Sequence, residues 1–376
     1  KLAYEQSIWD EFSAEGYANG SYYPVIGIVG QIRSGYGRFA GWTKQQQDDY
    51  INELGGSTTD WFKTLFLNSV STSHNVSVSG GSDKNTFYVS AGMNQNNGIV
   101  KRTNSNSYNF SAKVNGTPLS NLQYSTSVDF SYLTSLSPSQ SFDIFHYAYF
   151  ANPYEKLYNA DGSYAADETI YSLASVNGDT GQRLPLNGVN VMREINETTM
   201  NTNSTSTQIR GDISWTAFKG FKLYGLAAFT FSNDNSDCEI GKNTYSAWED
   251  RPFEGMAATT SNRIYGSLTQ TTNRNLSWLA RMQANYTTLI ARDHRISAVA
   301  GTEVRHNETK TIYHKFYGYD PVTGQHVSPV YIGTKADGSL TASELLVYRN
   351  YVDNLSGQQR SKTAFASFYG ALDYSY

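Results

Sequence analysis

The chain has 376 residues, of which 14% are aromatic and only 16% are Asp, Glu, Lys or Arg, against about 25% in an average soluble domain. Its formal net charge is −4 and it contains no basic run, which gives little support to nucleic-acid binding through phosphate neutralisation. No apolar stretch approaches the roughly 20 residues that a membrane-spanning helix needs. The lack of such a stretch does not exclude a membrane-spanning β-barrel, because the strands of a barrel are apolar on one face only.

Residues 1–71 show no sustained alternation, so we expect a loop region with a short helix that leads into the barrel. The helix is predicted over TKQQQDDYINEL, with Thr43 as its N-cap and its end at Gly55-Gly56. The glycine-rich run VIGIVGQIRSGYGRFAG, at 25–41, lacks the Gly-Lys-Ser/Thr ending of a phosphate-binding loop. It is therefore predicted to be a flexible loop.

The stretch HNVSVSGGSDKNTFYVSAGMNQNNGIV, at 74–100, predicts a β-hairpin. Valine, phenylalanine and other apolar residues alternate there with serine and tyrosine, which places two chemically different sets on the two faces of a sheet. Glycine in Gly80-Gly81 supplies the turn, since it reaches positive φ without steric cost. Similar alternation predicts seven further strands, near 107–114, 122–132, 208–217, 221–231, 275–286, 296–304 and 363–375.

Residues 72–376 are thus predicted to form about nine strands, joined by connections that are mostly alternately short and long. Long loops are expected at about 134–204, 233–273 and 307–360, and a brief connection near 94–104 is the exception. Successive connections of an antiparallel meander fall on opposite ends, so the short turns share one end and the long loops the other. This asymmetry is typical of a transmembrane antiparallel β-barrel with long extracellular loops.

A soluble β-sandwich also produces alternation and is the main alternative fold. Three features favour the barrel: strands of about 10 residues or more, apolar faces without charge, and Tyr and Trp near strand ends. The opposite faces carry charged residues, and we expect four of them to face the lumen: Asp129, Arg210, Asp212 and Arg281.

Several short sequence segments, in order and at consistent spacing, resemble the SusC/RagA-like family of TonB-dependent outer-membrane transporters of Gram-negative bacteria. They are DWFKTLF, HNVSVSGGSDKNTFYVSAG, NNGIV, YNFSAKVNG, ANPYEKLYNADGSY and SFYGALDYSY. The resemblance spans roughly 43–376 and implies one segment of a 22-stranded barrel. It also implies that the plug and the TonB-contacting segment lie in another part of a longer protein.

The resemblance further implies a SusD-like surface lipoprotein as partner, TonB as the energising partner, and outer-membrane lipid around the barrel. Aromatic side chains of the long loops are the candidates for contact with an oligosaccharide, an oligopeptide or the lipoprotein, or for packing the loops against one another. The contact candidates are Tyr147, Tyr149, Phe150, Tyr154, Tyr158, Tyr317 and Tyr319.

We expect no enzyme, cofactor or metal, since the six histidines form no HExxH motif and no nucleophile elbow is present. The acidic run at Asp234, Asp237 and Glu239 is a weak candidate for loop calcium. The favoured function is part of a nutrient transporter of the outer membrane. The alternatives are a non-transporting adhesin or structural barrel, and a soluble glycan-binding β-sandwich.

Overall fold

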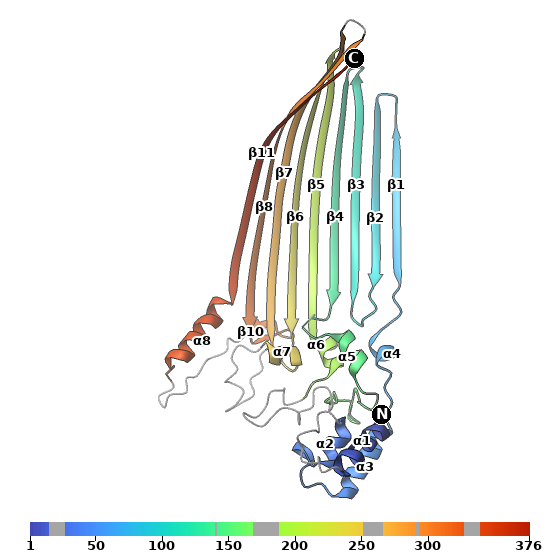
Figure 1. The fold of residues 1–376 in the computed structure, drawn as a ribbon, viewed down its shortest axis with the longest axis vertical. Helices are drawn as coiled ribbons and strands as arrows, with labels where there is room; N and C mark the ends of the chain where they lie inside the picture. The colour runs from blue at the N-terminus through green and yellow to red at the C-terminus, as the bar shows by residue number, and fades with distance from the viewer. Residues whose placement is uncertain (15–26, 140, 168–187, 251–265, 291–292, 327–338) are drawn as a thin grey trace.

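Nine strands of the described residues form one antiparallel sheet in simple meander order (Figure 1). The computed structural model describes residues 1–376 apart from 15–26, 140, 168–187, 251–265, 291–292 and 327–338. The strands are β1 (Ser71–Gly81), β2 (Asn85–Asn97), β3 (Asn104–Leu119), β4 (Leu122–Ser137), β5 (Thr198–Phe218), β6 (Phe221–Ile240), β7 (Ser267–Ile290), β8 (His294–Tyr317) and β11 (Ser356–Ser375). The described residues form no second sheet facing this one, so the sandwich alternative is not supported. The sheet is open at β1 and β11, so the described residues form no closed barrel.

Four short turns lie at one end of the sheet and the long connections at the other, as the sequence predicts, and the brief connection 98–103 is the expected exception at the end with the long connections. β1 and β2, β3 and β4, β5 and β6, and β7 and β8 are joined at the short-turn end, which is uppermost in Figure 1. Gly220 (φ +85°) and Gly81 (φ +152°) take backbone conformations that favour glycine in two of these turns. The remaining connections lie at the other end, called here the long-loop end, with the helices.

One face of the sheet carries a continuous apolar belt near the short-turn end. Residues directly opposite one another in an antiparallel pair share a face, and one row of the belt runs Val78, Val89, Ala112, Val128, Ile209, Phe229, Trp278. On β7 the belt runs from Tyr286 to Leu276, in alternate positions. Aromatic rings gather where the belt ends: Phe218 stacks on Phe221 at 4.9 Å. We call the opposite side of the sheet the polar face.

The strands extend farther than their alternation predicts. β4 continues to Ser137 and β5 begins at Thr198, so the first long connection is 138–197 instead of about 134–204. The second is 241–266 and the third 318–355. The reason is that both faces become polar beyond the belt: the backbone ladder continues, whereas the hydrophobic signal of alternation disappears.

The first 71 residues are more helical than the sequence predicts. The expected helix is present as α3 (Lys44–Gly55), with Thr43 capping it through a reciprocal pair of hydrogen bonds with Gln46. The structure adds α1 (Leu2–Ala14), α2 (Gly27–Arg33), the 3₁₀ helix η1 (Gly37–Phe39) and α4 (Trp61–Leu65).

The prediction of a flexible loop at 25–41 is wrong over α2 and η1. Ile28, Val29, Ile32 and Phe39 are buried in a small core with Tyr154. The low helix propensity of glycine is overridden here because burial of the branched side chains compensates for it.

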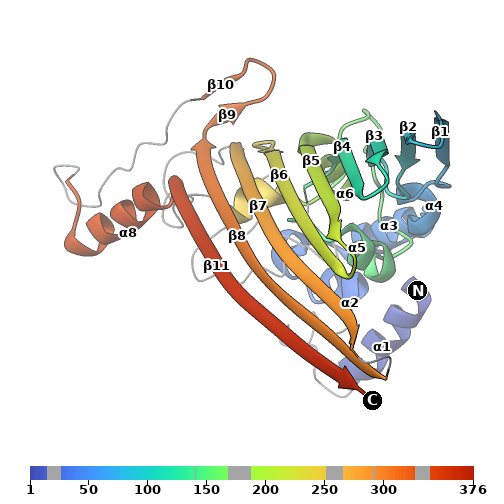
Figure 2. The same ribbon diagram turned by 90° about the horizontal axis from the view of Figure 1, so that it is seen from above.

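Further helices pack at the long-loop end: α5 (Ile144–Phe150), α6 (Val191–Glu197) and α7 (Tyr245–Glu249). Helix α8 (Ala342–Asp353) lies beside β11 and well apart from the other helices (Figure 2). A two-stranded ribbon of β9 (Tyr319–Asp320) and β10 (Gln325–His326) precedes it. Among the described helices, none combines the length and apolarity that crossing a membrane requires.

Candidate functional site: the polar face and the long-loop end

The predicted lumen residues all lie on the polar face, opposite the apolar belt. Asp129 pairs with Ser111 across the β3–β4 ladder and accepts a hydrogen bond from its hydroxyl at 2.5 Å. Arg210 and Asp212, two residues apart on β5, approach to 3.9 Å. These four charged groups therefore share one side of the sheet, where they need not be transferred into an apolar environment.

Glu303 joins two arginines on this face. Its carboxylate accepts from Nε of Arg281 at 2.7 Å and from Nε of Arg305 at 2.9 Å, and each arginine adds a second, shorter contact. Only Arg281 is among the predicted lumen residues. Glu303 and Arg305 flank Val304 of the belt, so the alternation of side chains along β8 could have placed both of them on the polar face.

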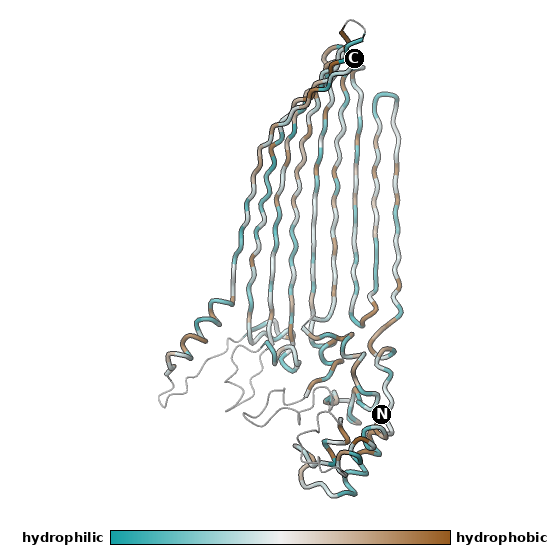
Figure 3. The backbone as a smooth tube through the Cα atoms, in the orientation of Figure 1, coloured by the Kyte–Doolittle hydropathy of each residue, from teal (hydrophilic) through white to brown (hydrophobic). Residues whose placement is uncertain are grey.

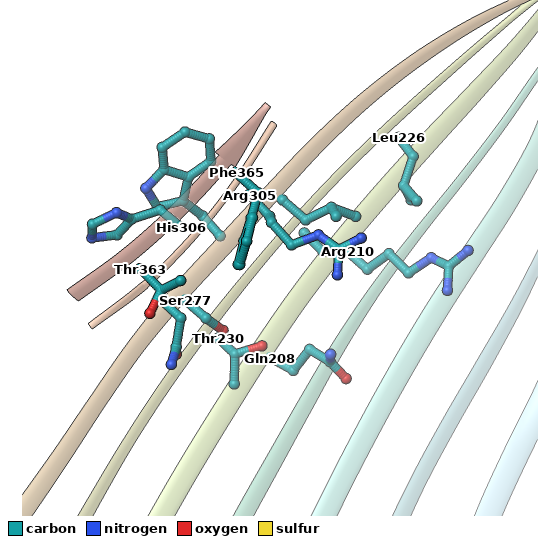
Figure 4. Close-up of a pocket in the computed structure, with 13 residues that line it drawn as sticks. Gln208, Arg210, Leu226, Thr230, Ser277, Arg305, His306, Thr363 and Phe365 are labelled. Carbon is teal, nitrogen blue, oxygen red and sulfur yellow. The ribbon is translucent and has the colours of Figure 1, made fainter. Parts of the chain in front are cut away.

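A hollow of about 470 Å³ opens on the polar face and is lined by residues of β5, β6, β7, β8 and β11. Figure 4 shows Arg210, Arg305 and Gln208 extending to one side of the sheet, with His306 on the other. The lining of the hollow also includes Thr230, Ser277, Leu226 and Phe365. Two guanidinium groups amid hydroxyls, an amide and an aromatic ring provide hydrogen-bond donors for an anionic or hydroxyl-rich ligand.

Two of the loop aromatics predicted as contact residues are buried. Tyr147 packs edge-on against Trp61 and donates to Asp167 at 2.6 Å. Tyr154 donates to Glu5 at 2.9 Å, and burial together with that carboxylate raises its pKa. In this arrangement both rings hold the loops together and neither is accessible to an external ligand.

The other predicted aromatics keep surface available. Tyr149 is 69% exposed and Phe150 55% exposed on α5, and Tyr158 stacks on Tyr164 with an exposed fraction of 44%. Tyr317 and Tyr319 are half-buried near the start of the third long connection. The five residues lie at the long-loop end but in separate places: on α5, in the turn after it, at the last residue of β8 and in β9.

The turn that carries Tyr158 belongs to the segment ANPYEKLYNADGSY. Tyr158 and Tyr164 form an isolated antiparallel bridge around Asp161-Gly162, and Gly162 has φ +82°. Hydrogen bonds from the hydroxyl and backbone amide of Ser163 hold the pKa of Asp161 below its ordinary value. At the other end of the segment, Trp61 donates to the carbonyl of Asn152 at 2.9 Å, which anchors the turn to α4.

A buried carboxylate fixes helix α7 against α6. Glu194, 1% exposed, accepts from the backbone amides of Tyr245 at 2.6 Å and Ser246 at 3.1 Å, and from the Ser246 hydroxyl at 2.7 Å. Burial raises the pKa of Glu194, although these hydrogen bonds act in the opposite direction. One carboxyl group of α6 therefore holds the first two residues of α7.

No group of three metal-ligating side chains occurs among the residues that the structure describes. The acidic run considered for calcium lies on strand β6 and not in a loop, so Asp234 points to the opposite face from Asp237 and Glu239. The weak calcium hypothesis is thus not supported by the geometry.

Comparison with known proteins points to one family. The chain is 44% identical over 66 residues to the TonB-dependent receptor SusC of Bacteroides thetaiotaomicron, a match that covers 18% of this chain and 6% of SusC. It superposes on the RagAB peptide importer in its closed-closed state with a TM-score of 0.61, at 16% identity, over 93% of this chain and 35% of that one. The open-open state gives 0.60, at 17% identity, over 93% and 34%. No family model matches.

The resemblance to the SusC/RagA-like TonB-dependent receptors is confirmed. The chain spans about a third of the length of the importer chains that it matches, so it corresponds to one part of them. The matched proteins are receptors and importers, in agreement with the prediction of a non-enzymatic family.

Proposed function

We propose that the chain forms part of the wall of a TonB-dependent outer-membrane transporter that imports oligopeptides or oligosaccharides. The observation that carries the proposal is the division of the sheet into an apolar belt and a polar face with an arginine-lined hollow. In a barrel, the belt contacts lipid and the polar face lines the lumen. RagAB is a peptide importer, and the similarity of this chain to it favours the oligopeptide class.

The polar face supports transport because it offers a wet, hydrogen-bonding surface at the height of the belt. Arg210 forms only a loose pair with Asp212, and its side chain is half exposed, so its guanidinium remains available beside the hollow. A peptide carboxylate or an acidic sugar would accept two hydrogen bonds from such a group.

A SusD-like lipoprotein is the proposed partner at the long-loop end, with TonB contacted through another part of the protein. Tyr149 and Phe150 support this, since they are large, exposed and adjacent, with ring centroids 5.0 Å apart. Aromatic residues of this kind often dominate protein interfaces. Exchange of both for serine should reduce co-purification of the lipoprotein about tenfold or more, with unchanged amounts of barrel in the membrane, and undiminished co-purification would contradict this assignment.

Uptake by intact cells tests the function. Cells that produce the full-length protein are supplied with labelled oligopeptides or labelled oligosaccharides, with and without an active TonB. We expect TonB-dependent uptake of one class, and a reduction of several-fold in the double variant Arg210→Gln, Arg305→Gln. The double variant Lys84→Gln, Lys219→Gln, in two of the short turns, is the control that removes the same charge. Uptake of neither class, or uptake that ignores TonB, would contradict the proposal.

A further inference from the structure

Three cations lie side by side on the face of the sheet that carries the apolar belt. The register places Arg274 of β7 directly opposite Lys310 of β8, and Lys310 directly opposite Arg360 of β11. Their positions alternate in step with Leu276 and Ala364 of the apolar belt, so all three are on the belt's side of the sheet. Like charges directly across a ladder repel each other, so this row is unfavourable without a counterion.

The protein compensates only one end of this row. Glu308, one row nearer the belt, accepts from Nε of Arg360 at 2.6 Å and lies 3.2 Å from Nζ of Lys362. Arg274 donates to the side-chain amide of Asn233 at 3.2 Å. Neither Arg274 nor Lys310 forms an ion pair with a described residue. With Lys362, four cations are therefore balanced by one carboxylate.

The row lies where the apolar belt ends. The belt covers ten residue steps on β7, from Tyr286 to Leu276, and ten on β11, from Tyr374 to Ala364. At about 3.3 Å per residue and a tilt near 40°, ten steps rise about 25 Å, which is the height of the apolar band of an outer-membrane barrel. The next outward-facing residues are Arg274 on β7 and Lys362, then Arg360, on β11.

The change from belt to cationic row is abrupt. In Figure 3 the part of β11 near the long-loop end is mostly hydrophilic, and it continues directly from the belt. In a barrel that spans a membrane with this belt in the lipid, the cations would therefore lie at the level of the lipid headgroups at the long-loop end.

We propose that this cationic row, formed by Arg274, Lys310 and Arg360 with Lys362 beside it, binds the phosphate-bearing headgroup of a lipid in the leaflet at the long-loop end. The acyl chains of the same lipid would lie along the belt beneath it, over Leu276 and Trp278. A phosphate placed among three cations relieves their mutual repulsion and accepts their hydrogen bonds. Continuity with the belt favours a lipid over a soluble anion. The inference rests on the membrane-spanning orientation within the proposed function, and not on transport.

Lipid binding by the full-length protein in a neutral detergent tests the proposal. Native mass spectrometry would measure titrations with diphosphoryl lipid A, with its dephosphorylated form and with inorganic phosphate. The triple variant Arg274→Gln, Lys310→Gln, Arg360→Gln should bind diphosphoryl lipid A roughly 10- to 100-fold more weakly than the unmodified protein. The matched control removes three positive charges elsewhere, by Lys84→Gln, Lys113→Gln and Lys222→Gln, and should bind it normally.

Several outcomes would overturn the proposal: unchanged binding by the triple variant, an equal loss in the control, equal affinity for the dephosphorylated lipid, or equal affinity for inorganic phosphate. A difference in gel migration between heated and unheated samples checks that each variant is folded. If the triple variant does not fold, the single variant Lys310→Gln tests the site, since that ammonium forms no ion pair with a described residue. A roughly fivefold weaker affinity for diphosphoryl lipid A supports the site, and an unchanged affinity refutes it. Substrate uptake is measured separately, so failure of the transport proposal leaves this readout intact.

Discussion

An arginine on the apolar belt should destabilise the protein, whereas an arginine one residue away should not. Val89 lies on the belt between Val78 and Ala112. Ser90 faces the other side, between Ser77 and Ser111. Val89→Arg and Ser90→Arg therefore introduce the same side chain on adjacent positions of β2, and they differ only in the face that receives it.

The expected difference follows from depth. Val89 shares its row with Ala112 and Val128, and Val128 is one residue from the centre of the belt segment Leu122–Tyr132. The offset is about 3 Å, so nearly the full midplane cost applies, about 2–4 kcal/mol for arginine. An arginine in place of Ser90 would lie near the carboxylate of Asp129, which already accepts from Ser111, and such an exposed pair changes stability by about 0–1 kcal/mol.

Urea unfolding of the full-length protein in phospholipid vesicles measures both variants against the unmodified protein. We expect Val89→Arg to lower the free energy of unfolding by about 2–4 kcal/mol and Ser90→Arg to change it by less than about 1 kcal/mol. Equal losses in the two variants would refute the assignment of the belt to lipid and of the polar face to the lumen.

Three further predictions concern single groups. The pKa of Glu194 is raised on folding, so hydrogen-exchange protection of 245–249 should be greatest below the ordinary carboxyl pKa and should fall as pH rises through the raised value. Glu194→Gln should make this protection less dependent on pH. The same pH dependence in the variant and the unmodified protein would contradict the reasoning. Thr43→Ala should destabilise α3 by about 1 kcal/mol, seen as faster exchange of its first turn, and unchanged exchange would argue against the cap. Glu303→Gln, which leaves two arginines unneutralised, should lower the melting temperature more than Asp212→Asn, whose ion pair spans 3.9 Å; the reverse order would argue against the Glu303 bridge.

The face of each predicted strand residue could be read from the sequence, because side chains alternate with a period of two whatever the strand's partner is. Asp129, Arg210 and Arg281 lie on the polar face for that reason. The ends of the strands are harder to predict from the sequence. Strand β5, for example, begins with TTMNTNSTSTQ, where hydroxyls and amides occupy both faces and leave no periodic signal.

The aromatic candidates show where sequence was insufficient. Tyr147 and Tyr149 are two residues apart on one short helix, yet Tyr147 is 3% exposed and Tyr149 69% exposed. A helix places residues two apart on different sides, but only the packing of α5 against Trp61 decides which side is inside. Likewise, burial of Tyr154 depends on Glu5, 149 residues away.

By itself the sequence determined the two-faced strands, the short turns at one end, the helix after Thr43 and the family resemblance, since each depends on residues near one another in the chain. Only the tertiary structure decided the helical core at 25–41, the joining of Arg281 and Arg305 by Glu303, and the alignment of Arg274, Lys310 and Arg360. Those arrangements depend on cross-strand register and on packing between distant segments. Local patterns limit such interactions to one face of a strand or helix, but they do not choose the partner.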